Sequence, residues 1–385
     1  MKVIVDCSRI NTGGAVQNGL AFLNNAASDP RHEWHVILSN RLASETSIEL
    51  QKAFPACRII GRGSNPLFQI KEALIDLPQH ERRCRPDVVF SVAGPTLWTA
   101  RTVHLEGFAV PHLIYPEIVP RLPLNTFGAA KLELALAWTR RRINRRKFFV
   151  VQSETVRQRL IEILSLPAEH IFTVKNSFSP IFAQQLQTAP SRPKNEQLRV
   201  FFPAAAYPHK NHVILPNVIE HLVKNWKLSV QFVVTLPLSS STWRQLWHDC
   251  RTRKVERNIT TAGEVRHQDM AALYKNCDLV FLPTLLECSS AVYPESFMAQ
   301  VPVCTSDLDF AREQCGEGAL YFNPFEPEAC AAAIAGLLQN SDLRQSMIKR
   351  GAQVLKDHYP TPQQKWEAQL KALEQAVGLA QIGQA

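Results

Sequence analysis

Short runs of β-branched and aromatic residues alternate along the chain with stretches whose apolar residues recur every three or four positions. The run KVIVDCS at 2–8 begins the first series, in which PDVVFSV occupies 86–92. A second series starts near Leu198 with LRVFFPAA, and DLVFLPT follows at 278–284. Runs that are this uniformly apolar are typical of parallel strands covered by helices on both faces. The pattern therefore predicts an α/β fold.

The two series are separated by TAPSRPKNEQ at 188–197, which is polar and contains two prolines. We interpret this segment as a linker or surface loop. A chain of 385 residues is also too long for one ordinary hydrophobic core. The sequence therefore predicts two doubly wound α/β domains. After Pro360, the stretch PTPQQKWEAQLKALEQAV predicts one final amphipathic helix.

Two glutamates, Glu287 and Glu295, follow the run DLVFLPT with seven residues between them. Ligands of open α/β sheets bind beyond the carboxyl ends of the strands, where Glu287 falls. We expect Ser289 and Ser290 to cap a helix that starts close by, because Pro294 fits only a first turn. Such a helix N-terminus binds phosphate, and carboxylates accept hydrogen bonds from sugar hydroxyls. The alternative is an ordinary helix whose carboxylates favour its own N-terminus.

The formal net charge of +9 is partly concentrated in one segment, TRRRINRRK, where Arg140–Lys147 holds five arginines and one lysine. One interpretation is a solvated helix face. A second is a surface attracted to anionic lipid headgroups. Nucleic acid is the third and least favoured, because no aromatic residues interleave with the arginines and no nucleic-acid-binding motif accompanies them. We therefore predict no nucleic-acid partner.

Nine cysteines are scattered along the chain without a CxxC pair or a Cys/His metal-ligand spacing. Such a pattern predicts reduced thiols in a cytosolic protein rather than a disulfide framework. The chain also contains no aspartate-rich metal motif, so we predict no metal site. No apolar run approaches the roughly 20 residues of a membrane span.

The stretch FFPAAAYPHKNHVIL at 201–215 contains the pair Lys210 and Asn211 in a short loop between a strand pattern and a helix pattern. Together with the two glutamates and the Pro302-Val303 dipeptide, it resembles the carboxy-terminal domain of a family-4 retaining glycosyltransferase of the GT-B fold. This is the group 1 type found in polysaccharide and lipopolysaccharide biosynthesis. Further matching positions are Gly263, Val265, Leu273, Tyr274 and Asp278 and, more weakly in the first half, Gly13, Gly14, Ser153 and Asn176.

The resemblance implies a GT-B fold, with two Rossmann-like doubly wound domains facing a central cleft. Residues 1–180 would form the acceptor-binding domain, with helix 360–385 packing back on it, and 181–359 would bind the nucleotide-sugar. The implied activity is that of a retaining hexosyltransferase, which moves a sugar from a nucleotide-sugar to a hydroxyl of a glycan or lipid-linked glycan. No metal or other cofactor is implied. The implied location is the cytoplasm, peripheral on the cytoplasmic face of the inner membrane.

The resemblance also assigns roles to individual residues. Lys210 would stabilise the charge that develops on the leaving diphosphate, Glu287 would position the donor sugar, and Glu295 would hold the ribose. The expected donor-binding residues are Gly13, Gly14, Lys210, Asn211, Val265, Glu287, Ser289, Ser290 and Glu295.

Catalytic residues from the first domain are less sharply defined. The family often carries a histidine near the anomeric carbon at the end of a strand, and TVHLEGFAVPHLIYPE offers His104, Glu106 and His112. We expect His104 inside the strand, and Glu106 and His112 in the loop beyond it. The expected catalytic set is Lys210, Glu287, His112 and Glu106. His209 and His212, on either side of Lys210, either face the phosphate or are solvated loop residues.

The chain departs from the family pattern at three places. Ala205 stands where an arginine usually helps to hold the diphosphate, CSS at 288–290 replaces Gly-Phe-Gly, and Gln300 replaces a glycine. Two other functions stay open. One is a nucleotide-sugar epimerase of the same fold, and the other is an inactive homologue that binds a nucleotide or glycan.

Overall fold

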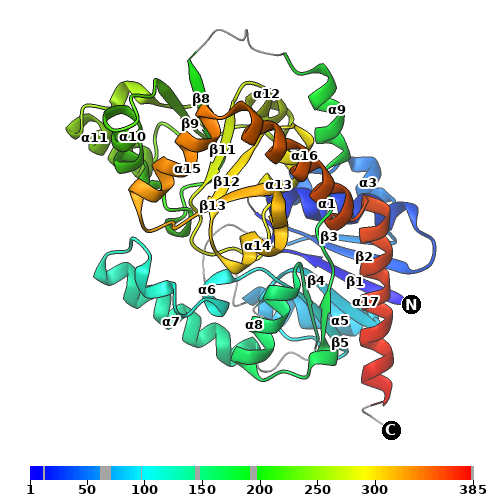
Figure 1. The fold of residues 1–385 in the computed structure, drawn as a ribbon. Helices are drawn as coiled ribbons and strands as arrows, with labels where there is room; N and C mark the ends of the chain where they lie inside the picture. The colour runs from blue at the N-terminus through cyan, green and yellow to red at the C-terminus, as the bar shows by residue number, and fades with distance from the viewer. Residues whose placement is uncertain (12–13, 61–70, 97, 144–147, 191–196, 383–385) are drawn as a thin grey trace. The chain divides into compact units, whose positions relative to one another are not determined.

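A computed structural model describes the chain except for residues 12–13, 61–70, 97, 144–147, 191–196 and 383–385 (Figure 1). Two compact units are present. Unit 1 comprises Met1–Ile114, Ala130–Lys175 and Gln363–Ala385, and unit 2 comprises Tyr115–Ala129 and Asn176–Pro362. Each unit is built around its own parallel sheet, which confirms the prediction of two doubly wound α/β domains.

The described residues of unit 1 form a seven-stranded sheet in the order β3-β2-β1-β4-β5-β6-β7, and every pairing in it is parallel. The first strand of the chain, which is paired on both sides, is buried from Val3 to Cys7, as expected when helices cover both faces of a parallel sheet. The strands are β1 (Lys2–Cys7), β2 (Glu33–Leu38), β3 (Ala56–Ile59), β4 (Val88–Gly94), β5 (Val103–Phe108), β6 (Phe148–Val151) and β7 (Ile171–Thr173).

Helices connect these strands and cover the sheet (Figure 1). Those preceding β6 are α1 (Gly14–Ser28), α2 (Asn40–Glu45), α3 (Ile48–Lys52), the π-helical turn η1 (Glu72–Asp76), α5 (Leu77–Cys84), α6 (Pro111–Ile114) and α7 (Thr126–Ile143), of which the residues up to Ala129 belong to unit 2. Those following β6 are α8 (Glu154–Leu164) and, at the end of the chain, α17 (Pro362–Ile382).

Helix α17 packs into the core of unit 1. Its Trp366 ring lies 5.1 Å from the ring of Phe22 and 5.6 Å from that of Trp34, measured between centroids. Leu370 and Leu373 are buried in the same cluster. The last helix in the sequence therefore completes the hydrophobic core around the N-terminal strands.

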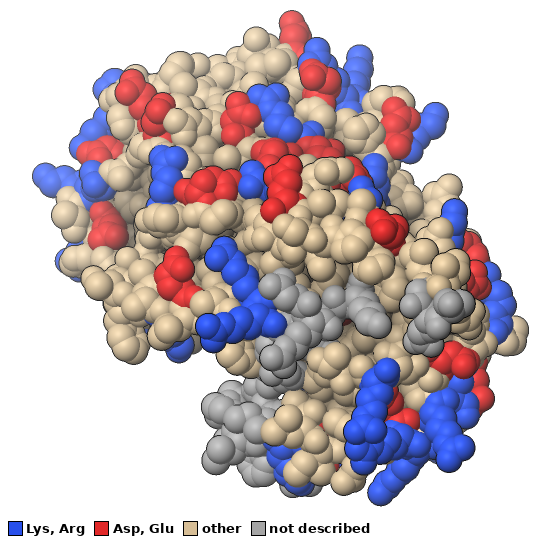
Figure 2. All heavy atoms as spheres, turned by 90° about the horizontal axis from the view of Figure 1, so that it is seen from below, with Lys and Arg blue, Asp and Glu red and all other residues tan. Residues whose placement is uncertain are grey.

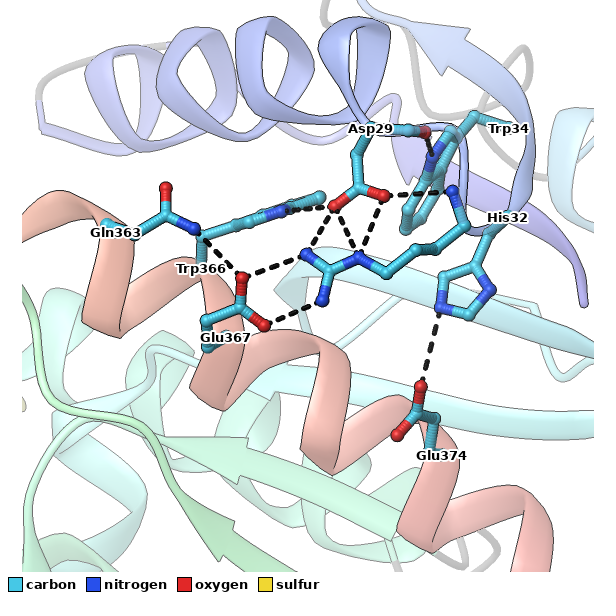
Figure 3. A network of polar contacts seen from close by, with 8 residues as sticks. Asp29, His32, Trp34, Gln363, Trp366, Glu367 and Glu374 are labelled. Carbon is cyan, nitrogen blue, oxygen red and sulfur yellow. Dashed lines mark hydrogen bonds and ion pairs between the residues drawn. The ribbon is translucent and has the colours of Figure 1, made fainter.

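A polar network reinforces this packing (Figure 3). Asp29 accepts hydrogen bonds from the Arg31 guanidinium and from Trp366 Nε1, the latter at 2.7 Å. Arg31 also pairs with both oxygens of Glu367 on α17, at 2.7 and 2.9 Å. The hydrogen bonds from Arg31 hold the pKa of Asp29 well below its usual range. Two chain segments remote in sequence are thus joined by a bidentate ion pair as well as by aromatic packing.

The described residues of unit 2 form a six-stranded sheet in the order β10-β9-β8-β11-β12-β13, again with parallel pairings throughout. Its strands are β8 (Leu198–Phe202), β9 (Val230–Val234), β10 (Ile259–Thr261), β11 (Leu279–Leu282), β12 (Val303–Ser306) and β13 (Ala319–Phe322). Its helices are α9 (Pro180–Thr188), α10 (Leu215–Lys224), α11 (Ser241–Thr252), α12 (Met270–Lys275), α13 (Val292–Met298), α14 (Asp309–Cys315), α15 (Pro327–Gln339) and α16 (Ser341–His358).

The segment Tyr115–Ala129 comes from the first half of the sequence but packs with unit 2. The Tyr115 hydroxyl donates a hydrogen bond of 3.0 Å to Asp309 Oδ1. Further along, the Arg121 guanidinium lies 3.2 Å from the centroid of the Phe325 ring, a cation–π contact. The chain therefore passes between the units more than once.

Among the described residues, no helix is both long enough and apolar enough to cross a membrane. All nine cysteines lie in the described part of the chain, and each is a free thiol.

Candidate active site

The loops that follow β8 and β11 form the centre of the site in unit 2. These two strands are neighbours in the sheet, with Val200 opposite Leu279, so their carboxyl ends lie side by side. After β8 the chain makes two short 3₁₀ turns, η4 (Pro208–Lys210) and η5 (His212–Ile214). The two loops are joined because Leu285 N donates a hydrogen bond of 2.8 Å to His209 O.

Asn211 separates the two 3₁₀ turns and has a left-handed backbone, with φ of +61°. Asparagine tolerates this conformation better than most residues. Its buried side chain donates from Nδ2 to Pro324 O at 2.9 Å, beyond the end of β13. The Lys-Asn loop is therefore fixed to a third strand end.

Lys210 forms an ion pair with Glu287 through Nζ and Oε2. The two side chains are only 17% and 16% exposed, so the pair is largely shielded from water. Lysine presents a compact positive charge, and the carboxylate keeps a second oxygen for other hydrogen-bond donors. The strand order of the sheet thus brings together two of the predicted site residues that are remote in sequence.

Glu295 lies in the first turns of α13 and is 8% exposed. Its Oε2 accepts a hydrogen bond of 2.8 Å from the Tyr274 hydroxyl. Burial raises the pKa of Glu295 to about 7, against the opposing effect of this hydrogen bond. The Tyr274 ring in turn lies 5.3 Å from the Phe182 ring and 5.2 Å from the Phe201 ring. The carboxyl group is therefore held in place by the aromatic core of unit 2.

The predicted capping of α13 by serine hydroxyls is wrong. The helix begins at Val292, and Ala291 occupies the N-cap position without a side-chain capping bond. Ser289 Oγ instead accepts a hydrogen bond of 3.0 Å from Asn176 Nδ2, and Ser290 N donates to Gln314 Oε1 at 2.9 Å. The Ser289 hydroxyl and the Ser290 backbone N–H thus form hydrogen bonds with residues distant in sequence. Pro294 does lie in the first turn, as expected.

The histidines beside Lys210 are both buried, so they are not solvated loop residues. The His212 ring lies 4.6 Å from the Phe202 ring, and its Nε2 has no hydrogen-bond partner among the described residues. Burial, with a contribution from the positive charge of Lys210, lowers the pKa of His212 to about 4. His209 stacks on the partly exposed ring of Tyr207, with centroids 5.5 Å apart.

In unit 1, His104 lies within β5 as expected and is part of a buried hydrogen-bonded chain. Ala100 N donates to His104 Nδ1 at 3.2 Å, which leaves the Nε2 hydrogen to donate to Ser91 Oγ at 2.9 Å. The Ser91 hydroxyl then donates to Asp6 Oδ2 at 3.1 Å, and Trp98 Nε1 donates to the same oxygen at 3.0 Å. The signal for this network in the sequence is the charged Asp6 within an apolar strand.

The expectation that Glu106 lies in the loop beyond the strand is wrong. β5 continues to Phe108, because Glu106 and Gly107 pair with Phe149 and Val150 of β6. Glu106 is buried, and its Oε1 accepts hydrogen bonds from Thr96 N at 2.7 Å and Thr96 Oγ1 at 2.8 Å. These contacts tie the strand to the segment that follows β4.

His112 lies beyond β5, as expected, but in the short helix α6 and not in a loop. Burial lowers the pKa of His112 from its ordinary value. It is therefore a neutral imidazole near neutral pH, the form that can accept a proton.

The remaining predicted residues lie on other loops. Gly14 begins α1, whereas Gly13 is outside the described residues. Val265 is partly buried between β10 and α12, two residues after Gly263, whose φ is +75°. Ala205, at the position of the usual family arginine, is exposed beyond β8. Within the described part of the chain, no group of three or more histidines, cysteines or carboxylates could hold a metal ion.

Solved structures with a similar fold include glycosyltransferases. One from Rickettsia africae is 14% identical, with a TM-score of 0.72 over 98% of each chain. HepE from Anabaena, in complex with UDP and glucose, is 15% identical, with a TM-score of 0.69 over 97% of this chain and 99% of its own. WaaG, a glycosyltransferase involved in lipopolysaccharide biosynthesis, is 14% identical, with a TM-score of 0.68 over 95% of this chain and 99% of its own.

At these identities, the structural likeness establishes the fold. None of the curated proteins compared with the chain matches it. A family model described as "Glycosyl transferases group 1" matches residues 184–354, which include the Lys-Asn loop and both glutamates. Residues 184–354 therefore match the group 1 glycosyl transferase model, within a chain that has the GT-B fold.

Proposed function

We propose that this protein is a retaining hexosyltransferase. It takes a sugar from a nucleotide-sugar and transfers it to a hydroxyl of a glycan or lipid-linked glycan. The observation that carries the proposal is the Lys210–Glu287 ion pair, beyond the adjacent ends of β8 and β11, in the same unit as the buried Glu295. A nucleotide-sugar has three parts that these residues suit. In the proposal, Lys210 contacts the diphosphate, Glu287 contacts the sugar and Glu295 contacts the ribose.

The diphosphate gains negative charge as its bond to the sugar breaks, and a fixed positive charge there stabilises the transition state. Lys210 supplies this charge in the proposal. Its partner Glu287 then accepts hydrogen bonds from the sugar hydroxyls. Donor binding thus replaces the Lys210–Glu287 ion pair with contacts from Lys210 to the diphosphate and from Glu287 to the sugar. Asn211 and Leu285 stabilise the loops that hold both residues.

Glu295 binds the ribose hydroxyls in this proposal. A ribose presents two neighbouring donors, and an ionised carboxylate can accept both. Tyr274 orients the carboxyl group and favours its ionised form. Gly14, Val265, Ser289 and Ser290, with the undescribed Gly13, complete the proposed donor-binding set.

Residues 1–180 with 360–385 bind the acceptor in the proposal, and 181–359 bind the nucleotide-sugar. His112 and Glu106 act from the acceptor side near the anomeric carbon. Retention means that the new bond forms on the face that the diphosphate leaves. His112 is the better placed of the two to exchange a proton, because Glu106 is enclosed in the sheet by Thr96.

We further propose that the reaction needs no metal ion, since Lys210 supplies the positive charge at the diphosphate. Turnover should then be unchanged after treatment with EDTA and after addition of Mg²⁺. A loss of activity on chelation that Mg²⁺ restores would contradict this part of the proposal.

The protein acts in the cytoplasm in this proposal, peripheral on the cytoplasmic face of the inner membrane, where lipid-linked acceptors are accessible. The basic segment Arg140–Lys147 provides the attraction to anionic lipid. Arg140 and Arg141 are exposed at the end of α7, whereas 144–147 lie outside the described residues. Figure 2 shows several groups of lysine and arginine side chains, in blue, on the face seen from below.

A thermal-shift panel of nucleoside diphosphates and their sugars tests the proposal. A donor present at 100 times its dissociation constant should stabilise the protein by roughly 2.7 kcal/mol. UDP-glucose is a suitable first member, because HepE was solved with UDP and glucose. With the donor that binds, the anomeric configuration of the product should match that of the donor by NMR. Conversion of the donor to another nucleotide-sugar without any acceptor, or binding without turnover, would contradict the proposal.

A further inference from the structure

Helix α7 is apolar on two opposite faces. At about 100° per residue, Leu132, Leu136 and Ile143 cluster on one side of the helix. Leu136 and Ile143 are buried, so this side faces the protein. Phe127, Leu134 and Trp138 lie within about 40° of one another on the other side. A helix on the surface of a globular protein normally presents polar residues there.

The second face is exposed. Phe127 is 80% exposed, Leu134 is 75% exposed and Trp138 is 49% exposed. We call these three residues the α7 ridge. Single exposed apolar residues are common, but three large ones aligned on one helix face mark an interaction surface.

Basic side chains flank the ridge. Lys131 and Arg141 are both exposed, and each lies about 40° from the line of the ridge, on opposite sides. The single carboxylate of α7, Glu133, is about 120° away. A ridge of Phe, Leu and Trp bordered by cations fits a membrane interface, where apolar groups enter the acyl boundary and cations contact headgroup phosphates.

We propose that the α7 ridge inserts into an anionic lipid surface, so that this helix docks the protein by apolar burial and not by charge alone. This inference deepens the proposed function, because it rests on a lipid-linked acceptor as the substrate. The flanking cations select anionic lipid over a neutral surface, and they also disfavour a second copy of the same ridge as the partner, because its cations would repel them. The docked helix lies in the membrane plane and does not cross the membrane.

Flotation with two kinds of vesicle tests the proposal, one of phosphatidylcholine alone and one of phosphatidylcholine mixed with phosphatidylglycerol. The wild type should float only with the mixed vesicles. A ridge variant, Phe127→Ser with Leu134→Gln and Trp138→Gln, keeps every charge and should lose at least about tenfold in partition coefficient. A charge variant, Lys131→Gln with Arg141→Gln, should lose roughly thirtyfold and should respond less to added salt than the wild type does.

Matched controls alter the same kinds of residue elsewhere. Ile48, Leu238 and Ile382 are exposed apolar residues, and Arg244 and Lys349 are exposed cations. Their replacement by serine or glutamine should leave flotation within about twofold of the wild type. Circular dichroism and thermal melting confirm that each variant is folded, and Leu134→Glu serves as a single-site version if the triple variant is unstable.

Nucleoside diphosphate binding, measured in the absence of vesicles, separates this inference from the proposed function. All α7 variants should bind the nucleotide as the wild type does, because no ridge residue belongs to the proposed donor site. Wild-type protein that binds nucleotide but floats with neither vesicle would overturn the docking inference alone. So would a ridge variant that floats normally, or sedimentation showing that the ridge mediates a dimer. Flotation without nucleotide binding would instead count against the proposed function.

Discussion

The Tyr274 hydroxyl donates a hydrogen bond of 2.8 Å to Glu295 Oε2 in the interior of unit 2. Burial raises the pKa of Glu295 to about 7, and it raises the pKa of Tyr274 well above its ordinary value. The carboxyl group therefore changes charge near physiological pH, while the tyrosine stays protonated. The pH thus sets whether Glu295 accepts two hydrogen bonds from a ligand or donates one of its own.

The stability of the protein should report this titration. Below about pH 4.5, Glu295 is protonated in both folded and unfolded chains, and it imposes no charge-burial cost. As the pH rises to about 7, the unfolded chain ionises first, so the folded state loses stability relative to the unfolded state. The complete loss is roughly 3 kcal/mol at most. Glu295→Gln removes the titration, so its advantage over the wild type should grow across this pH range.

Urea unfolding at about pH 5 and about pH 8 measures that difference on either side of the transition. The exposed Glu264 provides a control, since Glu264→Gln should change stability equally at both values. An advantage of Glu295→Gln that does not depend on pH would contradict the assignment.

The two site glutamates should affect different steps. Glu295→Gln should weaken binding of the free nucleoside diphosphate, because its proposed contact is the ribose. Glu287→Gln should leave that affinity nearly unchanged and lower the rate of transfer, because its proposed contact is the donor sugar. Calorimetry with the nucleoside diphosphate, paired with initial rates, distinguishes the two effects. Equal loss of nucleotide affinity in both variants would show that this division of roles is wrong.

Lys210→Ala should lower turnover by roughly 10²–10³, the range typical for removal of one electrostatic donor at a transition state. The substitution also leaves Glu287 without its cation in a shielded position, so we expect a modest loss of stability. Adding Glu287→Gln to this variant should recover part of the stability but not the turnover. The ion pair of Lys224 and Glu220 is more exposed, so Lys224→Ala should change neither quantity appreciably. A Lys210→Ala enzyme within twofold of wild-type turnover would remove this residue from the mechanism.

Ser91→Ala should reduce stability without altering the donor site. It removes a hydrogen-bond partner from Asp6 and from His104 in the buried chain of unit 1. An unsatisfied buried polar group costs about 1–3 kcal/mol. Equilibrium unfolding measures the loss, and nucleotide affinity should stay at the wild-type value. The exposed Ser44 is the control, because its hydroxyl donates to the carbonyl oxygen of Arg41, three residues away. If Ser91→Ala were as stable as the wild type, the chain of hydrogen bonds would not support this sheet.

The main features of the fold could be predicted because they depend on local patterns. The apolar runs at Val3 and Val200 become buried parallel strands, and Pro294 marks the start of a helix. The meeting of Lys210 and Glu287 depends on strand order, which a single sequence does not specify. It was anticipated through the resemblance to a known domain, not from the spacing of the two residues.

The expectations that were wrong depended on tertiary partners. Pairing with Phe149 on the adjacent strand extends the strand past Glu106. The serine hydroxyls next to α13 suit a helix cap, but Asn176 contacts Ser289 instead. In each case, the local sequence is compatible with the expected structure, but a contact with a segment distant in sequence determines the actual one.

The position of α17 has a consequence for the order in which the protein folds during its synthesis. Trp366, Leu370 and Leu373 fill the core beneath the strands of unit 1, yet the ribosome makes them after every strand of unit 2. Unit 2 can therefore bury its own core while the chain is still being translated. Unit 1, although most of it is made first, must wait with an exposed apolar face until the last helix emerges from the ribosome. Synthesis from the N-terminus thus leaves the first-made unit to be completed last.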